Sequence, residues 1–172
     1  IPSLAVYWAV AEEQCLAAGI WRSFPTLPQG QGGLGERLAY VYSQALKLHS
    51  AVCFMGADSP HISVKAVAAA VAQTLERNAD RFQLGETSDG GFYFFGGGIE
   101  IPAAVWESVE YSSANTAREL RAGLEPYGRV DSFAVDFDID TEEDLLRMSG
   151  LEASGLLQEQ AEVIEWGRKL HE

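Results

Sequence analysis

Two groups of aspartates follow two apolar segments of the chain. Asp58 comes after the apolar segment 51–55, and Asp138 and Asp140 come after the apolar segment 133–135. Short apolar runs of this kind predict buried strands. Ligands of an open α/β sheet bind where strands end at their carboxyl edge, and carboxylates that meet there repel one another unless a cation lies between them. The pattern therefore predicts a site for Mg²⁺ or Mn²⁺, which carboxylates bind together with the phosphates of a nucleotide diphosphate.

Each aspartate also has a purely structural explanation. Asp58 suits the turn at Ser59-Pro60, where aspartate is common. Asp138, Asp140 and Asp144 surround a helix start at Thr141, where carboxylates favour the helix dipole. Taken singly, these explanations have more weight than a metal site. The joint placement of both groups at predicted strand ends favours the metal site.

Residues 29–37 form a glycine-rich segment that opens a helix predicted over 34–48. Glycines allow close approach of a ligand, and the helix N-terminus offers free N–H groups. The segment lacks the Gly-Lys-Ser/Thr of a Walker A loop, and no adequate strand precedes it for a dinucleotide fingerprint. By itself, such a segment is more often structural.

Three further residues are candidates for chemistry. Asp89 stands in an Asp-Gly turn, which either closes a hairpin or lines a substrate pocket. His61 lies three residues after Asp58 and is a candidate base, although an exposed loop histidine is the simpler interpretation. Ser59 has no partnered histidine in a recognisable arrangement, so a serine nucleophile is not expected.

Strands alternate with helices along most of the chain. This order predicts a single α/β domain over residues 1–172, with a mainly parallel twisted sheet flanked by helices. The core is expected over about 1–148 and a C-terminal helix over about 152–170. Two extended segments, 80–87 and 91–97, flank the turn at 88–90.

The composition excludes some classes of partner. The 172 residues have a formal net charge of −13, which argues against nucleic acids and anionic membranes, since both require a basic surface. The acidity has the alternative explanation of solubility alone. No apolar run approaches the ~20 residues of a membrane span, and no signal peptide is apparent, so a cytoplasmic location is expected.

Five motifs in order resemble one family of bacterial proteins. They are Gln-Gly-x-Gly-x-Leu-Gly-Glu-Arg-Leu at 29–38, Gly-Ala-Asp-Ser-Pro at 56–60, Asp-Gly-Gly-Phe-Tyr at 89–93, Tyr-Ser-Ser at 111–113 and Asp-Ile-Asp-Thr-Glu-Glu-Asp-Leu at 138–145. The family is the glycosyltransferase-A-type group that includes arsenosugar-biosynthesis glycosyltransferase-like proteins. It is similar in fold to the guanylyltransferases of molybdenum-cofactor and phospholactate metabolism. The resemblance covers roughly residues 1–148.

The resemblance implies a nucleotide-diphospho-sugar transferase fold and a role for each motif. Asp58 and Asp140 match the two metal-binding aspartates, with Asp138 as the alternative for the second. The residues implied to contact the nucleotide or sugar are Gln29, Gly32, Gly33, Leu34, Gly35, Glu36, Arg37, Ser59, Gly90 and Gly91. Asp89 and His61 are the candidate catalytic bases.

The chain departs from the family pattern in two places. Members usually begin with a strand and a basic loop that grips the nucleotide phosphates, whereas this chain begins at Ile1 close to what resembles the second strand. Gly33 also stands where the family commonly has aspartate. Either an N-terminal segment is missing from the chain, which would leave a hydrophobic sheet edge, or the site is incomplete.

The sequence leads to one principal hypothesis and two alternatives. The principal one is metal-dependent glycosyl transfer from a nucleotide-diphospho-sugar to a small acceptor. The alternatives are nucleotidyl transfer of the guanylyltransferase type, and a non-catalytic binding domain that kept the fold and lost the phosphate-binding loop. The expected ligands are Mg²⁺ or Mn²⁺, a nucleotide-sugar and a small-molecule acceptor. Association into a homo-oligomer stays open.

Overall fold

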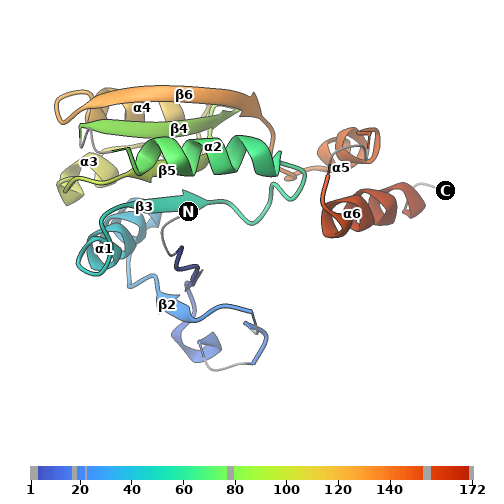
Figure 1. Cartoon of the computed structure of the whole chain (residues 1–172), viewed down its shortest axis with the longest axis horizontal. Coiled ribbons are helices and arrows are strands. Elements are labelled where there is room, and N and C mark those ends of the chain that lie inside the picture. The colour runs from blue at the N-terminus through green and yellow to red at the C-terminus, as the bar shows by residue number, and fades with distance from the viewer. Residues whose placement is uncertain (1–3, 17–18, 22, 77–79, 153–155, 171–172) are drawn as a thin grey trace.

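The computed structural model describes residues 4–16, 19–21, 23–76, 80–152 and 156–170 (Figure 1). Within these ranges the chain forms six strands, six α-helices and one 3₁₀ turn. In order they are β1 (Trp8–Val10), η1 (Glu13–Cys15), β2 (Thr26–Pro28), α1 (Leu34–Leu46), β3 (Val52–Met55), α2 (Val64–Thr74), β4 (Arg81–Thr87), β5 (Phe92–Gly97), α3 (Ala103–Glu107), α4 (Thr116–Leu124), β6 (Arg129–Asp136), α5 (Glu142–Ser149) and α6 (Gln158–Lys169).

The strands form two sheets. β1 and β2 make a separate parallel pair, and the larger sheet has the order β3-β5-β4-β6. In the larger sheet β5 is antiparallel to both of its neighbours, while β4 and β6 are parallel. The α/β architecture is confirmed, but the mainly parallel sheet is not, because the larger sheet is mixed.

The mixed sheet follows from the short connection between β4 and β5. Only Ser88 to Gly91 separate the two strands, and a connection of this length can join only antiparallel neighbours. Gly90 makes the turn possible, because its φ of +97° lies in the region that favours glycine. The hairpin places the turn at the same end of the sheet as the carboxyl end of β4.

The carboxyl ends of β3, β4 and β6 lie at one end of the larger sheet, because these three strands run in the same direction. Figure 1 shows the chain leaving β6 at this end and continuing into α5 and α6, which lie beyond the sheet. The loop between β3 and α2 extends toward the same end. The fold thus gathers the strand ends and the C-terminal helices in one region.

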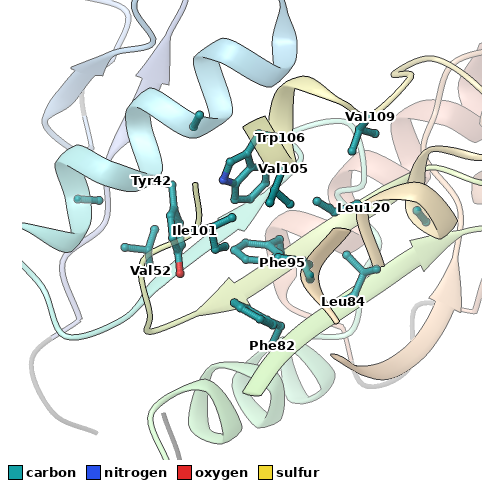
Figure 2. Packing of buried hydrophobic residues seen from close by; sticks show 14 residues of the cluster. Tyr42, Val52, Phe82, Leu84, Phe95, Ile101, Val105, Trp106, Val109 and Leu120 are labelled. Carbon is teal, nitrogen blue, oxygen red and sulfur yellow. The ribbon is translucent and has the colours of Figure 1, made fainter. Parts of the chain in front are cut away.

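The main core fills the space between the larger sheet and helices α1, α3 and α4 (Figure 2). Trp106 and Phe95 are fully buried, with their rings in an edge-to-face contact at 5.0 Å between centroids. Tyr42 packs edge-on against Phe95 and donates a hydrogen bond of 2.8 Å to the carbonyl oxygen of Ile99. A buried tyrosine hydroxyl needs such a partner, since an unpaired polar group in a core is costly.

A second, smaller core lies at the carboxyl end of the sheet. Its fully buried members are Phe137, Met148 and Ile164, which come from the segment after β6, from α5 and from α6. This cluster fixes the helix pair α5/α6 against the segment that carries Asp138 and Asp140. The C-terminal helix was expected over about 152–170 and is observed as α6 over Gln158–Lys169. It packs next to the candidate site.

Near the N-terminus, the described residues form the three-residue strand β1 and the 3₁₀ turn η1. No described helix is long and apolar enough to cross a membrane.

Candidate metal centre

The structure brings together the three aspartates that the sequence placed at two strand ends. Asp58, Asp138 and Asp140 each offer one carboxylate oxygen, and the three oxygens lie within 4.8 Å of one another. Asp58 and Asp140 are exposed and Asp138 is half-buried. We call these three residues the aspartate triad. Because two of its three side chains are exposed, the triad is accessible to a ligand.

The triad is assembled by loops rather than by adjacent strands. β3 and β6 are the two outer strands of the larger sheet, so their ends are separated by three strand spacings, roughly 14 Å. The segments after the two strands bridge this gap. The backbone N–H of Ile139 donates a hydrogen bond of 3.1 Å to the carbonyl oxygen of Asp58, which fastens the segments beside the carboxylates.

Gly56 is required for the position of the Asp58 carboxylate. A Cβ atom at Gly56 would lie 2.5 Å from Oδ1 of Asp58, closer than real Cβ contacts. The amide of Gly56 also donates a hydrogen bond to the carbonyl oxygen of Tyr93, which ties the start of the loop to β5. The aspartate side chain folds back over the glycine.

His61 is buried, so the expectation of an exposed loop histidine is wrong. Its side chain is 2% exposed, its Nε2 lies 3.1 Å from Oδ1 of Asp136, and its ring stacks on Phe137 at 4.0 Å between centroids. The reason is the convergence of the two loops, which covers the histidine with the segment after β6. His61 therefore links the loop of Asp58 to the segment of Asp138 and does not face a ligand.

The C-terminal helix also contacts the loop of Asp58. Nε2 of Gln160 in α6 donates hydrogen bonds of 2.8 Å to the carbonyl oxygens of Pro60 and Ile62. Both N–H groups of one amide thus satisfy the backbone of the loop, which lies about 100 residues earlier in the chain. The loop is held from two sides, by the segment after β6 and by α6.

The electrostatics of the triad favour a cation. Burial is the main cause that raises the pKa of Asp138, and the negative charges of Asp89, Asp140 and Asp58 raise it further. Like charges at this separation destabilise one another, and a bound cation relieves that repulsion. The negative charges of the triad therefore favour the binding of a cation.

The carboxylate oxygens of the triad suit a hard divalent cation. Neighbouring oxygens of an octahedral Mg²⁺ lie about 3.0 Å apart. The separations in the triad are at most 4.8 Å, so inward shifts of roughly 1 Å or less by each oxygen bring all three onto one ion. Oxygen-only ligands favour Mg²⁺, Mn²⁺ or Ca²⁺ over zinc or copper.

Asp89 lies at the same end of the sheet, in the turn between β4 and β5. Its Oδ1 accepts hydrogen bonds from Oγ1 of Thr87 and, over 3.0 Å, from the N–H of Gly91. The bond from Thr87 is the main cause that lowers the pKa of Asp89. The turn is fixed to α4, since the N–H of Ala117 donates to the carbonyl oxygen of Gly90 over 2.8 Å. Asp89 is an exposed carboxylate on a rigid turn.

The glycine-rich segment before α1 is held by its own side chains. Glu36 accepts a hydrogen bond of 2.7 Å from the N–H of Gly33, and Arg37 donates one of 3.0 Å to the carbonyl oxygen of Gly32. Gln29 donates to the carbonyl oxygen of Ala9. The side chains of Gln29, Glu36 and Arg37, which were expected to contact a nucleotide, thus form hydrogen bonds with the protein's own backbone.

Three other predicted contact residues have contrasting environments. Gly35 is buried at the contact with α3, where a Cβ would lie 2.5 Å from the carbonyl oxygen of Trp106. Leu34 is half exposed, which leaves it free to meet a ligand. Ser59 is 1% exposed and lies beside Asp58, so its side chain supports the aspartate rather than a substrate.

Sequence reasoning missed the residues that hold the triad in place. Asp136, Phe137 and Gln160 have no distinctive spacing relative to Asp58, and only the folded chain makes them neighbours of its loop or of the segment after β6. The one signal in the sequence was Phe137 itself, an aromatic residue between two acidic ones.

The fold is α/β, with the aspartate triad at the carboxyl end of the larger sheet. The structure is similar to that of the "putative nucleotide-diphospho-sugar transferase" from Desulfovibrio desulfuricans G20, with a TM-score of 0.77 and 17% sequence identity over 97% of this chain and 74% of that chain. At this identity the likeness establishes the fold.

The chain belongs to the family described as "Uncharacterized protein conserved in bacteria (DUF2064)", whose profile matches residues 3–113. The match includes Asp58, His61 and Asp89, whereas Asp138 and Asp140 lie beyond it. No curated protein matches the chain. The structural likeness supports the fold expected from the sequence motifs, while the resemblance to arsenosugar-biosynthesis proteins stays a prediction.

Proposed function

We propose that this protein transfers a glycosyl group from a nucleotide-diphospho-sugar to a small acceptor, with a divalent cation bound by Asp58, Asp138 and Asp140. The observation that carries the proposal is the aspartate triad at the carboxyl end of the sheet. The fold shared with a protein described as a nucleotide-diphospho-sugar transferase supports the same class of donor.

The triad residues have complementary parts in this proposal. The exposed Asp58 binds the cation from the loop after β3. The exposed Asp140 and the half-buried Asp138 bind it from the segment after β6. When bound, Mg²⁺ or Mn²⁺ neutralises the negative charge that develops on the diphosphate leaving group. The hydrogen bond between Ile139 and Asp58 holds the two loops that carry these carboxylates together.

Asp89 is the base in this proposal. It is exposed, lies on a turn next to the triad and, like any ordinary aspartate, is ionised at neutral pH. An ionised carboxylate can orient an acceptor hydroxyl and accept its proton as the glycosyl group is transferred. His61, the other candidate, is buried against Asp136 and Phe137, so we assign it a supporting position.

Ligand-dependent unfolding tests the cation and the donor together. We expect Mn²⁺ with a nucleotide-sugar from a panel of uridine, guanosine, adenosine and cytidine donors to raise the free energy of unfolding by about 2.7 kcal/mol at 100 times the Kd. Asp58→Asn should abolish the metal-dependent part. Asp80→Asn is the matched control, because Asp80 is exposed at the opposite end of β4.

The products released separate this function from its alternatives. Glycosyl transfer, or slow hydrolysis of the donor, releases a nucleoside diphosphate, whereas nucleotidyl transfer from a triphosphate releases pyrophosphate. If no nucleotide-sugar stabilises the protein in the presence of Mg²⁺ or Mn²⁺, the proposal is contradicted. Binding without release of any product would identify the protein as a binding domain.

A further inference from the structure

Arg147 in α5 is stacked on the residue that precedes Asp138. Its Cζ lies 3.9 Å from the centre of the Phe137 ring. The His61 ring lies 4.0 Å from the same centre at an interplanar angle of 27°. Both distances correspond to face-to-face contact, so the guanidinium and the imidazole cover opposite faces of the phenylalanine. The stack holds the guanidinium over the ring of Phe137.

Most of the hydrogen-bonding capacity of Arg147 is unused by the protein. Its only hydrogen bond within the described residues is a long one of 3.4 Å from Nη1 to Oγ of Ser88. No carboxylate oxygen of the described residues lies within 4.0 Å of its nitrogens. A guanidinium has five N–H donors, so this cation keeps several of them available to a ligand.

The position of Arg147 relates it to both parts of the site. Its stacking partner Phe137 directly precedes Asp138, and its hydrogen-bond partner Ser88 directly precedes Asp89. The hydrogen bond from Thr141 is the main cause that lowers the pKa of Asp144, and the charge of Arg147 lowers it further. The charge of Asp144 in turn acts on Asp89. Arg147 therefore lies at the border between the aspartate triad and the Asp89 turn.

From these contacts we propose that Arg147 binds the diphosphate of the nucleotide ligand beside the cation of the triad. The inference rests on the proposed function, since it requires that ligand. The triad carries three negative charges, so one divalent cation leaves a net charge of −1 facing the anionic diphosphate. A guanidinium held against an aromatic ring can offer two parallel N–H groups, the geometry that phosphate oxygens accept best.

A purely structural role of Arg147 makes a different prediction. A cation in the last turn of α5 favours the helix dipole, and stacking on Phe137 adds to packing. If these were its only roles, its replacement would loosen the segment of Asp138 and weaken the binding of metal and nucleotide alike. Diphosphate binding predicts that the two affinities respond differently.

Calorimetric titrations of Arg147→Gln distinguish the two roles. Mn²⁺ alone should bind the variant as tightly as the wild type or more tightly, because a nearby positive charge has been removed. UDP, GDP, ADP and CDP are titrated separately in the presence of saturating Mn²⁺. The nucleotide that the wild type binds should bind the variant about 10- to 100-fold more weakly, as expected for lost charge-assisted hydrogen bonds.

Two variants serve as comparisons. Arg129→Gln removes the same charge at the opposite end of β6, where Arg129 pairs with Asp131, and should leave nucleotide affinity unchanged. Arg147→Lys keeps the charge and loses the planar fork, so its affinity should fall between those of the wild type and Arg147→Gln. Urea unfolding of each variant verifies that it is folded at the titration temperature.

The outcomes separate this inference from the proposed function. Equal nucleotide affinities of the wild type and Arg147→Gln would overturn the assignment of Arg147 and leave the proposed function standing. A parallel loss of Mn²⁺ and nucleotide affinity would also overturn it in favour of a structural role. A wild type that binds none of the four nucleotides would overturn both.

Discussion

The backbone N–H of Ile139 donates a hydrogen bond of 3.1 Å to the carbonyl oxygen of Asp58. This bond joins the segments that follow the two outer strands of the larger sheet, β3 and β6. It places Asp58 beside the two aspartates that flank Ile139. The candidate metal centre therefore depends on a loop contact, and changes in the loops should alter metal affinity without unfolding the core.

Gly56→Ala should weaken metal binding more than it weakens the fold. The new Cβ would lie 2.5 Å from Oδ1 of Asp58, and the carboxylate would have to move away from the triad. The free energy of unfolding without metal should fall by about 1 kcal/mol or less, because an exposed side chain can shift at low cost. Mn²⁺ affinity should fall at least tenfold by calorimetry. Unchanged affinity would show that this carboxylate position is unimportant.

Asp138→Asn should stabilise the metal-free protein at pH 7. The pKa of Asp138 is raised in the folded state, so its protonation favours folding below the unfolded-state pKa, and that contribution is lost as pH rises through the folded-state pKa. Asparagine avoids this loss, and its advantage should vanish toward about pH 4.

Saturating Mn²⁺ should make the wild type more stable than Asp138→Asn. The cation stabilises the wild type through Asp138, whereas asparagine is a weaker ligand without a negative charge. Urea unfolding from pH 4 to 8, with EDTA or with Mn²⁺, measures both effects. A variant that is less stable than the wild type in EDTA at pH 7 would contradict the repulsion within the triad.

Thr87→Val should destabilise the protein at neutral pH and have less effect in acid. Thr87 donates a hydrogen bond to Asp89 and is the main cause of its lowered pKa. The stability linked to this shift is present above the unfolded-state pKa and is lost as pH falls through the folded-state pKa. The expected cost at pH 7 is about 1 kcal/mol. A cost independent of pH would instead indicate a packing defect at this buried position.

His61→Ala should affect both the fold and the metal centre. The variant loses the hydrogen bond to Asp136 and the stacking on Phe137, and it leaves a cavity between the loops. We expect a loss of about 2–3 kcal/mol in the free energy of unfolding and weaker Mn²⁺ binding. His49→Ala is the control, because His49 is half-buried after α1 and contacts Tyr7. Intact metal affinity in His61→Ala would show that the loops keep their geometry without the histidine.

Local signals predicted some starts and turns accurately. Thr141 and Asp144 form the reciprocal capping box that begins α5, with hydrogen bonds of 3.0 and 3.2 Å between backbone and side chain. The Asp89-Gly90 pair forms the turn between β4 and β5. Such features depend on residues close together in the chain, so they can be recognised without the tertiary structure.

The pairing of the strands and the burial of single side chains could not be predicted from local patterns. The alternation of strands and helices suggested a mainly parallel sheet, but the hairpin at residues 88–91 inserts an antiparallel strand. His61 was expected in solvent, yet the segment after β6 covers it. Both outcomes depend on contacts between residues far apart in the sequence, which a local pattern does not encode.

The amino-acid sequence by itself determined the class of fold and the three aspartates of the candidate centre, because apolar strands followed by acidic residues leave a recognisable local pattern. Only the tertiary structure decided that the carboxylates meet and that Phe137 lies between His61 and Arg147. The physical reason is that β3 and β6 are outer strands. Their ends can meet only through loops, and the contacts between those loops depend on how the whole sheet is assembled, which no local pattern encodes.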